Sequence, residues 1–195
     1  MKILLANITL SLLAGSETFI YTLAIQLKKL GHKVQCFSPS LGIISDELDK
    51  EGISSFNQIS TSGVKPFSFV FKEEPDHNYD VIIANHNHIV RILREQFPKT
   101  PIISTIHGII HFQQEDGKEV WAPEHPELES GVNQFISVSE EIKEKLQKDY
   151  NIDSIIIRNF IDTKRFYQKK KISKKPKQFL FNSNYHGAHD PEVEI

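Results

Sequence analysis

Polar residues or glycines come directly after most of the apolar runs in this sequence. They are Asn7 and Gly15 after residues 3–6, Asn85, His86 and His88 after residues 81–84, His107 and Gly108 after residues 102–106, Ser139 after residues 135–138, and Arg158 and Asn159 after residues 154–157. Such groups can hydrogen-bond substrate hydroxyls or hold developing charge. If the runs are parallel strands of one open sheet, they converge beyond its carboxyl edge, where ligands bind. We therefore predict a binding site at that edge; the competing interpretation is that strand ends are polar because they face solvent.

Gly15 and Ser16 stand at the start of an expected helix. A glycine lets a ligand approach the backbone closely, and the amides and dipole of a helix N-terminus favour a phosphate group. The chain has neither G-x-G-x-x-G nor G-x-x-x-x-G-K-[ST], so it lacks the dinucleotide fingerprint and the P-loop. Gly15 is interpreted either as a phosphate contact or as a plain turn glycine.

Four histidines lie near two neighbouring strand ends: His86, His88, His107 and His111. Histidines in this arrangement could hold a metal ion, but no Cys, Asp or Glu stands at ligand spacing beside them. We therefore predict that they form hydrogen bonds and bind no metal. His107, which directly follows a strand and precedes Gly108, is the candidate catalytic residue. A nucleophilic mechanism is not indicated, because G-x-S-x-G does not occur and Cys36 stands within an apolar strand.

The elements that would position these residues alternate along the chain. Strands are expected at residues 3–6, 33–38, 81–84, 102–106, 135–138 and 154–157, helices at residues 16–31, 88–97 and 139–150, and loops at residues 54–78 and 111–130. This alternation predicts an α/β fold, a Rossmann-like open parallel sheet with helices on both faces. Ser16 is expected to cap the first helix and Gly31 to end it, while Ser137 and Glu140 have the spacing of a capping box.

The composition limits the classes open to the chain. Its 195 residues, 39% hydrophobic and 25% charged, can bury a core, and a net charge of -2 gives no general attraction to nucleic acid. The single cysteine, Cys36, excludes an intramolecular disulfide and predicts a buried reduced thiol in a cytoplasmic protein. Residues 3–14 after Lys2 resemble a secretory signal, but Asn7 and Thr9 interrupt them and the segment supplies the first expected strand.

Three regions are expected along the chain. Residues 1–163 would form one domain, residues 164–177 a basic linker, and residues 178–195 the first strand and start of a second, incomplete domain. The lysines of the linker would allow weak peripheral contact with anionic lipid on the cytoplasmic face of a membrane, although a solvated linker is the simpler interpretation. No run approaches the roughly 20 apolar residues of a membrane span.

Six stretches carry a resemblance to a known family through their order and spacing. They are A-G-S-E at residues 14–17, L-G-H-K-V at 30–34, Y-D-V-I-I-A-N-H at 79–86, T-I-H-G at 105–108, S-V-S-E at 137–140 and I-R-N-F-I-D-T-K-R-F at 157–166. Together they resemble the N-terminal domain of the GT-B glycosyltransferases of family 4, over most of residues 1–166. Ala14 stands where the family usually has a first glycine, and Arg158 and Phe160 stand where it has the proline and glycine of a closing turn.

The resemblance implies a hexosyltransferase that moves a sugar from a nucleotide-sugar donor to a glycan, lipid or other acceptor, with retention and without a cofactor or metal. In such enzymes the N-terminal domain mainly holds the acceptor and the C-terminal domain holds the donor. By the resemblance, Gly15, Ser16, Arg158 and Asn159 face the donor diphosphate and sugar, His107 the transferred sugar, and Asn85, His86, His88 and Gly108 the acceptor. The C-terminal donor domain is expected to be absent from this chain, so this half alone would be inactive.

Two other functions are open. A nucleotide-sugar epimerase shares the two-domain architecture, and analysis of the product would separate it from a transferase. A non-catalytic binding module that recruits a separate donor-binding chain is the alternative from another class, and co-purification of a second polypeptide would favour it.

Overall fold

The computed structural model describes residues 1–60, 69–71, 78–108, 110–113, 119–122 and 131–160. At residues 58–60, 69–71, 87–88, 110–113 and 119–122 it describes the backbone only. The predicted linker and the start of a second domain, residues 164–195, lie outside this part of the chain, so those boundaries stay predictions.

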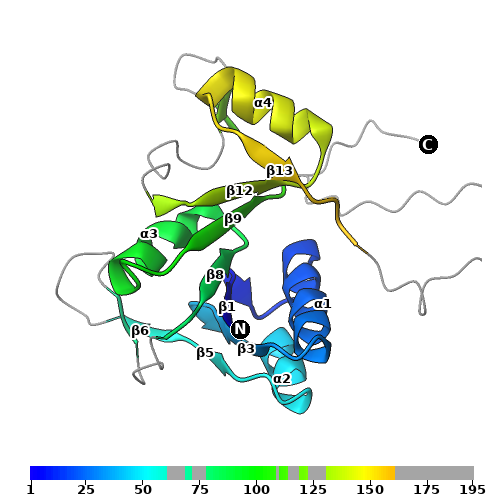
Figure 1. Cartoon of the computed structure of the whole chain (residues 1–195), viewed down its shortest axis with the longest axis vertical. Coiled ribbons are helices and arrows are strands. Elements are labelled where there is room, and N and C mark those ends of the chain that lie inside the picture. Colours follow the sequence, from blue (N-terminus) through cyan, green and yellow to red (C-terminus); the bar gives the residue numbers. More distant parts are fainter. Residues whose placement is uncertain (61–68, 72–77, 109, 114–118, 123–130, 161–195) are drawn as a thin grey trace, which may run out of the picture. The chain divides into compact units, whose positions relative to one another are not determined.

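Seven strands form one sheet in which all neighbours are parallel, in the order β13-β12-β9-β8-β1-β3-β5 (Figure 1). The strands are β1 Lys2–Ala6, β3 Lys33–Phe37, β5 Ser55–Phe56, β8 Val81–Ala84, β9 Ile102–Ile106, β12 Gln134–Ser137 and β13 Ser154–Ile156. From β1 the chain adds β3 and β5 on one side and then returns to add β8 to β13 on the other. The order therefore reverses between β1 and β8, which is the switch point where open α/β sheets bind ligands.

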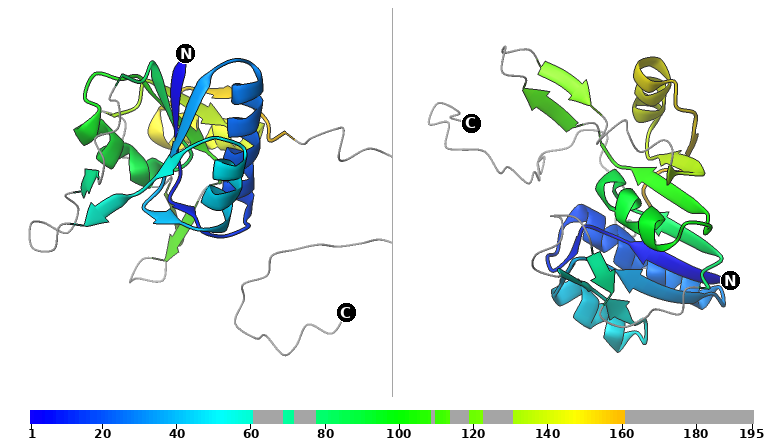
Figure 2. Two further views of the ribbon diagram at one scale, coloured as in Figure 1. Left: turned by 90° about the horizontal axis from the view of Figure 1, so that it is seen from below. Right: turned by 90° about the vertical axis from the view of Figure 1, so that its left-hand side faces the viewer.

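Helices cover both faces of the sheet, as Figure 2 shows from its left-hand view. They are α1 Gly15–Lys29, α2 Ile43–Lys50, α3 Asn87–Gln96 and α4 Glu140–Tyr150. Side chains alternate along β1: Ile3 and Leu5 join the cluster that holds α1 and α2, whereas Leu4 and Ala6 join the cluster that holds α3. Because both faces of β1 are buried, its sequence is a continuous apolar run.

The elements predicted around the sheet's carboxyl edge are confirmed to within one or two residues, and Gly31 ends α1 in the left-handed region with φ +87°. The predicted cap of α1 is wrong. The helix begins at Gly15 after extended Ala14, and the Ser16 hydroxyl lies inside the first turn, where it donates to Glu17 Oε2 at 2.8 Å.

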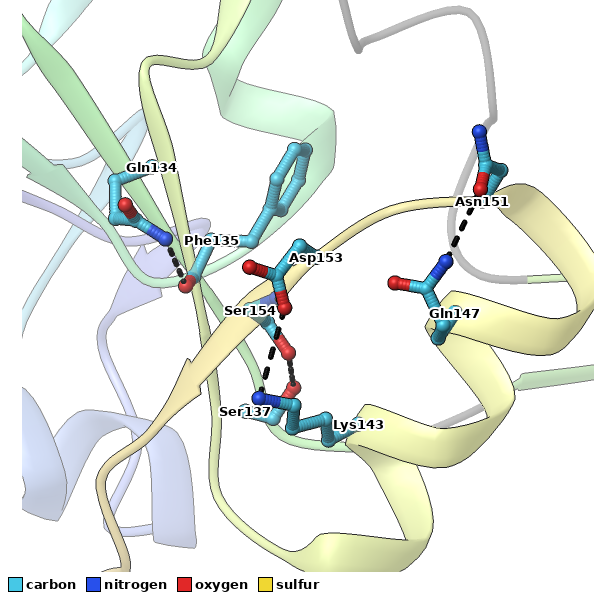
Figure 3. A network of polar contacts seen from close by, with 8 residues as sticks. All are labelled: Gln134, Phe135, Ser137, Lys143, Gln147, Asn151, Asp153 and Ser154. Carbon is cyan, nitrogen blue, oxygen red and sulfur yellow. Dashed lines mark hydrogen bonds and ion pairs between the residues drawn. The ribbon is translucent and has the colours of Figure 1, made fainter.

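The predicted capping box of α4 is also wrong. Strand β12 continues through Ser137, whose buried hydroxyl bonds to that of Ser154 on β13 at 2.6 Å (Figure 3). The cap falls two residues later, where Ser139 Oγ accepts from the amide of Ile142 at 3.3 Å.

Several short elements occupy segments that were expected to be loops or were not expected at all. Besides β5 and α2 they are β2 Thr9–Leu10, β4 Ser40–Leu41, β6 Gln58–Ser60, β7 Phe69–Phe71, β10 Ile110–Gln113 and β11 Glu119–Ala122. β6 with β7 and β10 with β11 form antiparallel pairs, and β2 pairs with β4 in parallel. The prediction of loops at residues 54–78 and 111–130 is therefore wrong where β5, β6, β7, β10 and β11 lie, because these strands of two to four residues are too short to show a pattern of alternation. None of the described helices is long and apolar enough to cross a membrane.

Candidate functional site

Two buried asparagines meet at the switch point, one at the carboxyl end of each of the adjacent strands β1 and β8. Asn7 and Asn85 are both 0% exposed. Asn85 Nδ2 donates to Asn7 Oδ1 at 3.2 Å and to the backbone carbonyl of Ser16 at 3.1 Å, and Asn7 Nδ2 donates to the carbonyl of Thr9 at 2.7 Å. A buried polar side chain is costly unless its hydrogen bonds are made, and here the two amides satisfy each other and the loop that leads into α1.

His107 joins this group from the end of the next strand, β9. Its Nε2 lies 2.5 Å from Asn85 Oδ1, and the imidazole is half-buried. The ring of Phe19, on α1, meets the imidazole edge to face with 4.9 Å between centroids, and the His86 ring lies 6.1 Å away. Three strands and one helix thus position a single imidazole at the carboxyl edge of the sheet.

The first turn of α1 borders the same group through the Ser16 carbonyl. Gly15 is exposed, and a Cβ added there would meet nothing within 4 Å, so a ligand can approach this turn. Glu17 points inward and is only 3% exposed. The geometry suits a small group beside the backbone of Gly15.

The segment after β13 returns towards α1. Phe160 stacks against Phe19 with 4.9 Å between ring centroids, which brings the end of the described chain close to His107. Arg158 is exposed, and its Nη2 lies 3.7 Å from Glu140 Oε1 at the start of α4. Asn159 is exposed as well.

The structure therefore brings together some of the predicted site residues. Asn85, Ser16 and His107 are in contact through the Asn85 amide, with His86 nearby. Arg158 instead pairs with Glu140, and Gly108 is exposed beyond β9. The backbone of His88 lies in α3, but its side chain is outside the described part of the structure.

Two residues of this group, Phe19 and Phe160, were not predicted as site residues. Phe19 is part of the apolar pattern of α1 and carries no sequence signal that separates it from core residues. Phe160 comes just after Arg158 and Asn159 in the segment that follows β13 Ser154–Ile156, so its nearness to a strand end was the available signal. Among the described residues, no group of three or more His, Cys, Asp or Glu side chains is arranged to hold a metal ion.

A hollow of about 350 Å³ lies at the opposite, amino edge of the sheet, beside the starts of β12 and β13. Two of the residues that line it bond to side chains of α4: Asp153 Oδ1 lies 3.5 Å from Lys143 Nζ, and Asn151 Oδ1 accepts from Gln147 Nε2 at 3.0 Å (Figure 3). We interpret this hollow as a crease between the two segments that enter β12 and β13.

The parallel seven-stranded sheet with helices on both faces defines a Rossmann-like domain. The family model of Glycosyltransferase Family 4 matches residues 13–165, which is more than half of the chain. The chain therefore belongs to Glycosyltransferase Family 4, and the resemblance found in its sequence is confirmed. None of the curated proteins matches the chain.

Solved structures share this fold. HepE (Alr3699) of Anabaena, in complex with UDP and glucose, aligns with a TM-score of 0.59 and 14% identity over 84% of this chain and 46% of that chain. Sucrose-phosphate synthase from Thermosynechococcus elongatus aligns with a TM-score of 0.57 and 15% identity over 85% of this chain and 50% of that chain. These are GT-B proteins, and the present chain spans about half of their length.

Proposed function

We propose that this chain is the acceptor-side half of a glycosyltransferase that moves a hexosyl group from a nucleotide-sugar donor to an acceptor hydroxyl. The observation that carries the proposal is the asparagine and histidine group at the switch point, beside the open first turn of α1, in a chain of Glycosyltransferase Family 4. HepE structures that contain UDP or UDP-glucose support a nucleotide-sugar donor.

In this proposal different residues bind the donor diphosphate, the transferred sugar and the acceptor. Gly15 and the amides of the first turn of α1 approach the donor diphosphate, because a helix N-terminus stabilises negative charge. His107 holds a hydroxyl of the transferred sugar. His86, His88 and Gly108 face the acceptor, and Arg158 and Asn159 approach the donor when the second domain is in place.

Catalysis rests on stabilising the charge of the departing diphosphate by preoriented donors, which is often the largest contribution in group transfer. The partner that completes the site is a donor-binding domain, and neither a metal nor a further cofactor takes part. We propose that the protein acts on nucleotide sugars in the cytoplasm. The basic residues 164–177 would make weak contact with a membrane surface.

The direct test uses the intact protein, by which we mean this chain together with its donor-binding domain. It is incubated with a panel of isotope-labelled nucleotide sugars and candidate acceptors, and the product is identified by mass spectrometry. The proposal expects a glycosylated acceptor and a released nucleoside diphosphate. It expects the 195-residue chain by itself to give no product. A product that is an epimerised nucleotide sugar would contradict the proposal, and so would transfer by the 195-residue chain without a second domain.

A further inference from the structure

The orientation of the Asn85 amide is fixed by two independent carbonyl groups. The carbonyl of Ser16 can only accept, so the Asn85 atom that faces it at 3.1 Å is the donor Nδ2. The carbonyl of Thr9 also can only accept, so the Asn7 atom that faces it is Nδ2. The other amide atom of Asn7, the acceptor Oδ1, therefore faces Asn85. Because Asn7 Oδ1 is an acceptor, the Asn85 atom that bonds to it must also be the donor Nδ2.

Both constraints place the Asn85 oxygen opposite His107, with 2.5 Å between Oδ1 and Nε2. An amide oxygen accepts and cannot donate, so a hydrogen bond at this distance requires the proton of His107 to be on Nε2. Asn85 is 0% exposed, and water therefore does not compete for its oxygen. The tautomer of a histidine is set by the hydrogen-bond partner of one of its nitrogens. Here that partner is the Asn85 amide, whose orientation is fixed by Asn7 and by the Ser16 carbonyl.

We propose that Asn85 is a positioning residue that holds the His107 imidazole in the Nε2–H tautomer and couples it to the first turn of α1. In the neutral ring Nδ1 then carries the lone pair and acts as an acceptor. The substrate group that fits an acceptor nitrogen is a hydroxyl, and a diphosphate oxygen does not fit it. An acceptor Nδ1 matches the sugar hydroxyl that the proposed function assigns to His107, and it leaves the diphosphate to the turn at Gly15; this match rests on the function proposed above.

The coupling to α1 follows from the same amide. Asn85 Nδ2 holds the Ser16 carbonyl, one residue after Gly15, while Asn85 Oδ1 holds His107. One buried side chain thus fixes the distance between the place proposed for the diphosphate and the place proposed for the sugar. A shift of the Asn85 amide would move both, and displacements of about 1 Å can reduce turnover by about 100-fold.

The first experiment observes the tautomer directly. In the intact protein labelled with ¹⁵N-histidine, the His107 ring is assigned by comparison with His107→Gln, and its nitrogens are measured at a pH where the ring is neutral. We expect a slowly exchanging proton on Nε2 and an unprotonated Nδ1. The variant Asn85→Leu keeps a similar volume without an acceptor, so the Nε2 proton should be lost to rapid exchange. A proton on Nδ1 in the wild-type protein overturns the proposal, and the wild-type measurement decides it even if Asn85→Leu does not fold.

The second experiment separates positioning from a merely structural role. In the intact enzyme we expect Asn85→Leu and His107→Ala each to lower kcat/KM by about 10- to 100-fold, and the double variant to lose little more than His107→Ala alone. Multiplicative losses would overturn the proposal, because they would mean that Asn85 acts without His107. The NMR measurement needs no turnover, so a failure of sugar transfer and a failure of the tautomer assignment are distinguishable.

Discussion

Arg94, near the carboxyl end of α3, hydrogen-bonds both to the turn that follows the helix and to the segment that enters β12. Its guanidinium donates to the carbonyls of Phe97 (3.2 Å), Pro98 (3.0 Å) and Thr100 (3.0 Å) in the turn that follows the helix. It also donates to the Gly131 carbonyl at 2.7 Å. Replacing Arg94 by Ala leaves this cluster of carbonyls without its shared donor.

The cost of Arg94→Ala can be estimated from these contacts. A hydrogen bond to a charged group contributes about 1.5–3 kcal/mol, but Arg94 is only half-buried and the released carbonyls can in part bind water. The contacts also share one side chain, so their contributions do not add. We expect a loss of about 2–3 kcal/mol in the free energy of unfolding, which is a large share of the stability of a small domain.

The assay is urea unfolding followed by circular dichroism, with the midpoint and the slope m compared between variants. With m of about 1–3 kcal/mol per M urea, the midpoint for Arg94→Ala should fall by about 1 M or more at unchanged m. The matched control is Glu95→Ala, the next residue on α3, which removes an exposed ion pair with Arg91 at 3.4 Å that is worth less than about 0.5 kcal/mol. Equal midpoints for the two variants would refute the claim that the hydrogen bonds of Arg94 stabilise the fold.

Other predictions follow from single positions. Burial, aided by the charge of Asp49, raises the pKa of the Cys36 thiol from 9.0 to about 12. Between these values the unfolded chain loses a proton that the folded chain keeps, so stability falls as the pH rises, by up to about 1.4 kcal/mol per pH unit. The unfolding free energy of wild type relative to Cys36→Ala should therefore decrease from pH 9 to 11, and a constant difference would contradict this. Removing the cap in Ser139→Ala should cost about 1 kcal/mol in urea unfolding. Gly15→Ala should not lower the unfolding midpoint, because the added Cβ meets nothing within 4 Å and alanine suits a helix, yet it should weaken nucleotide-sugar binding in calorimetry of the intact protein; unchanged binding would remove Gly15 from the site.

The central strands were predictable because both of their faces are covered. The runs that became β1, β8 and β9 are continuous and apolar, and alternation with helices then required parallel pairing. Helix α2 escaped prediction because it has only eight residues and buries Ile44 and Leu48 while leaving Ile43 52% exposed. A helix of two turns gives too few positions for a periodic signal.

The location of the candidate site was predictable, but its connections were not. Position after a strand was enough to select His107 and Asn85, because the carboxyl ends of parallel strands share one edge. That Asn85 holds the Ser16 carbonyl could not be inferred, because these residues are 69 positions apart and meet only through the placement of β8 beside β1. The pairing of Arg158 with Glu140 was missed for a similar reason, since it depends on where α4 begins relative to the end of β13.

The proposed function is tested most directly by the turnover of His107→Ala beside that of His32→Ala in the intact protein. His32 is the matched control, because it lies before β3 at the amino edge of the sheet, where its Nδ1 is 3.4 Å from the amino group of Met1. Steady-state rates are to be measured with the nucleotide sugar and acceptor identified from the product screen. We expect His107→Ala to lower kcat/KM by about 10- to 100-fold and His32→Ala to leave it unchanged. Equal activity of the two variants would contradict the claim that sugar transfer takes place at the carboxyl edge of this sheet.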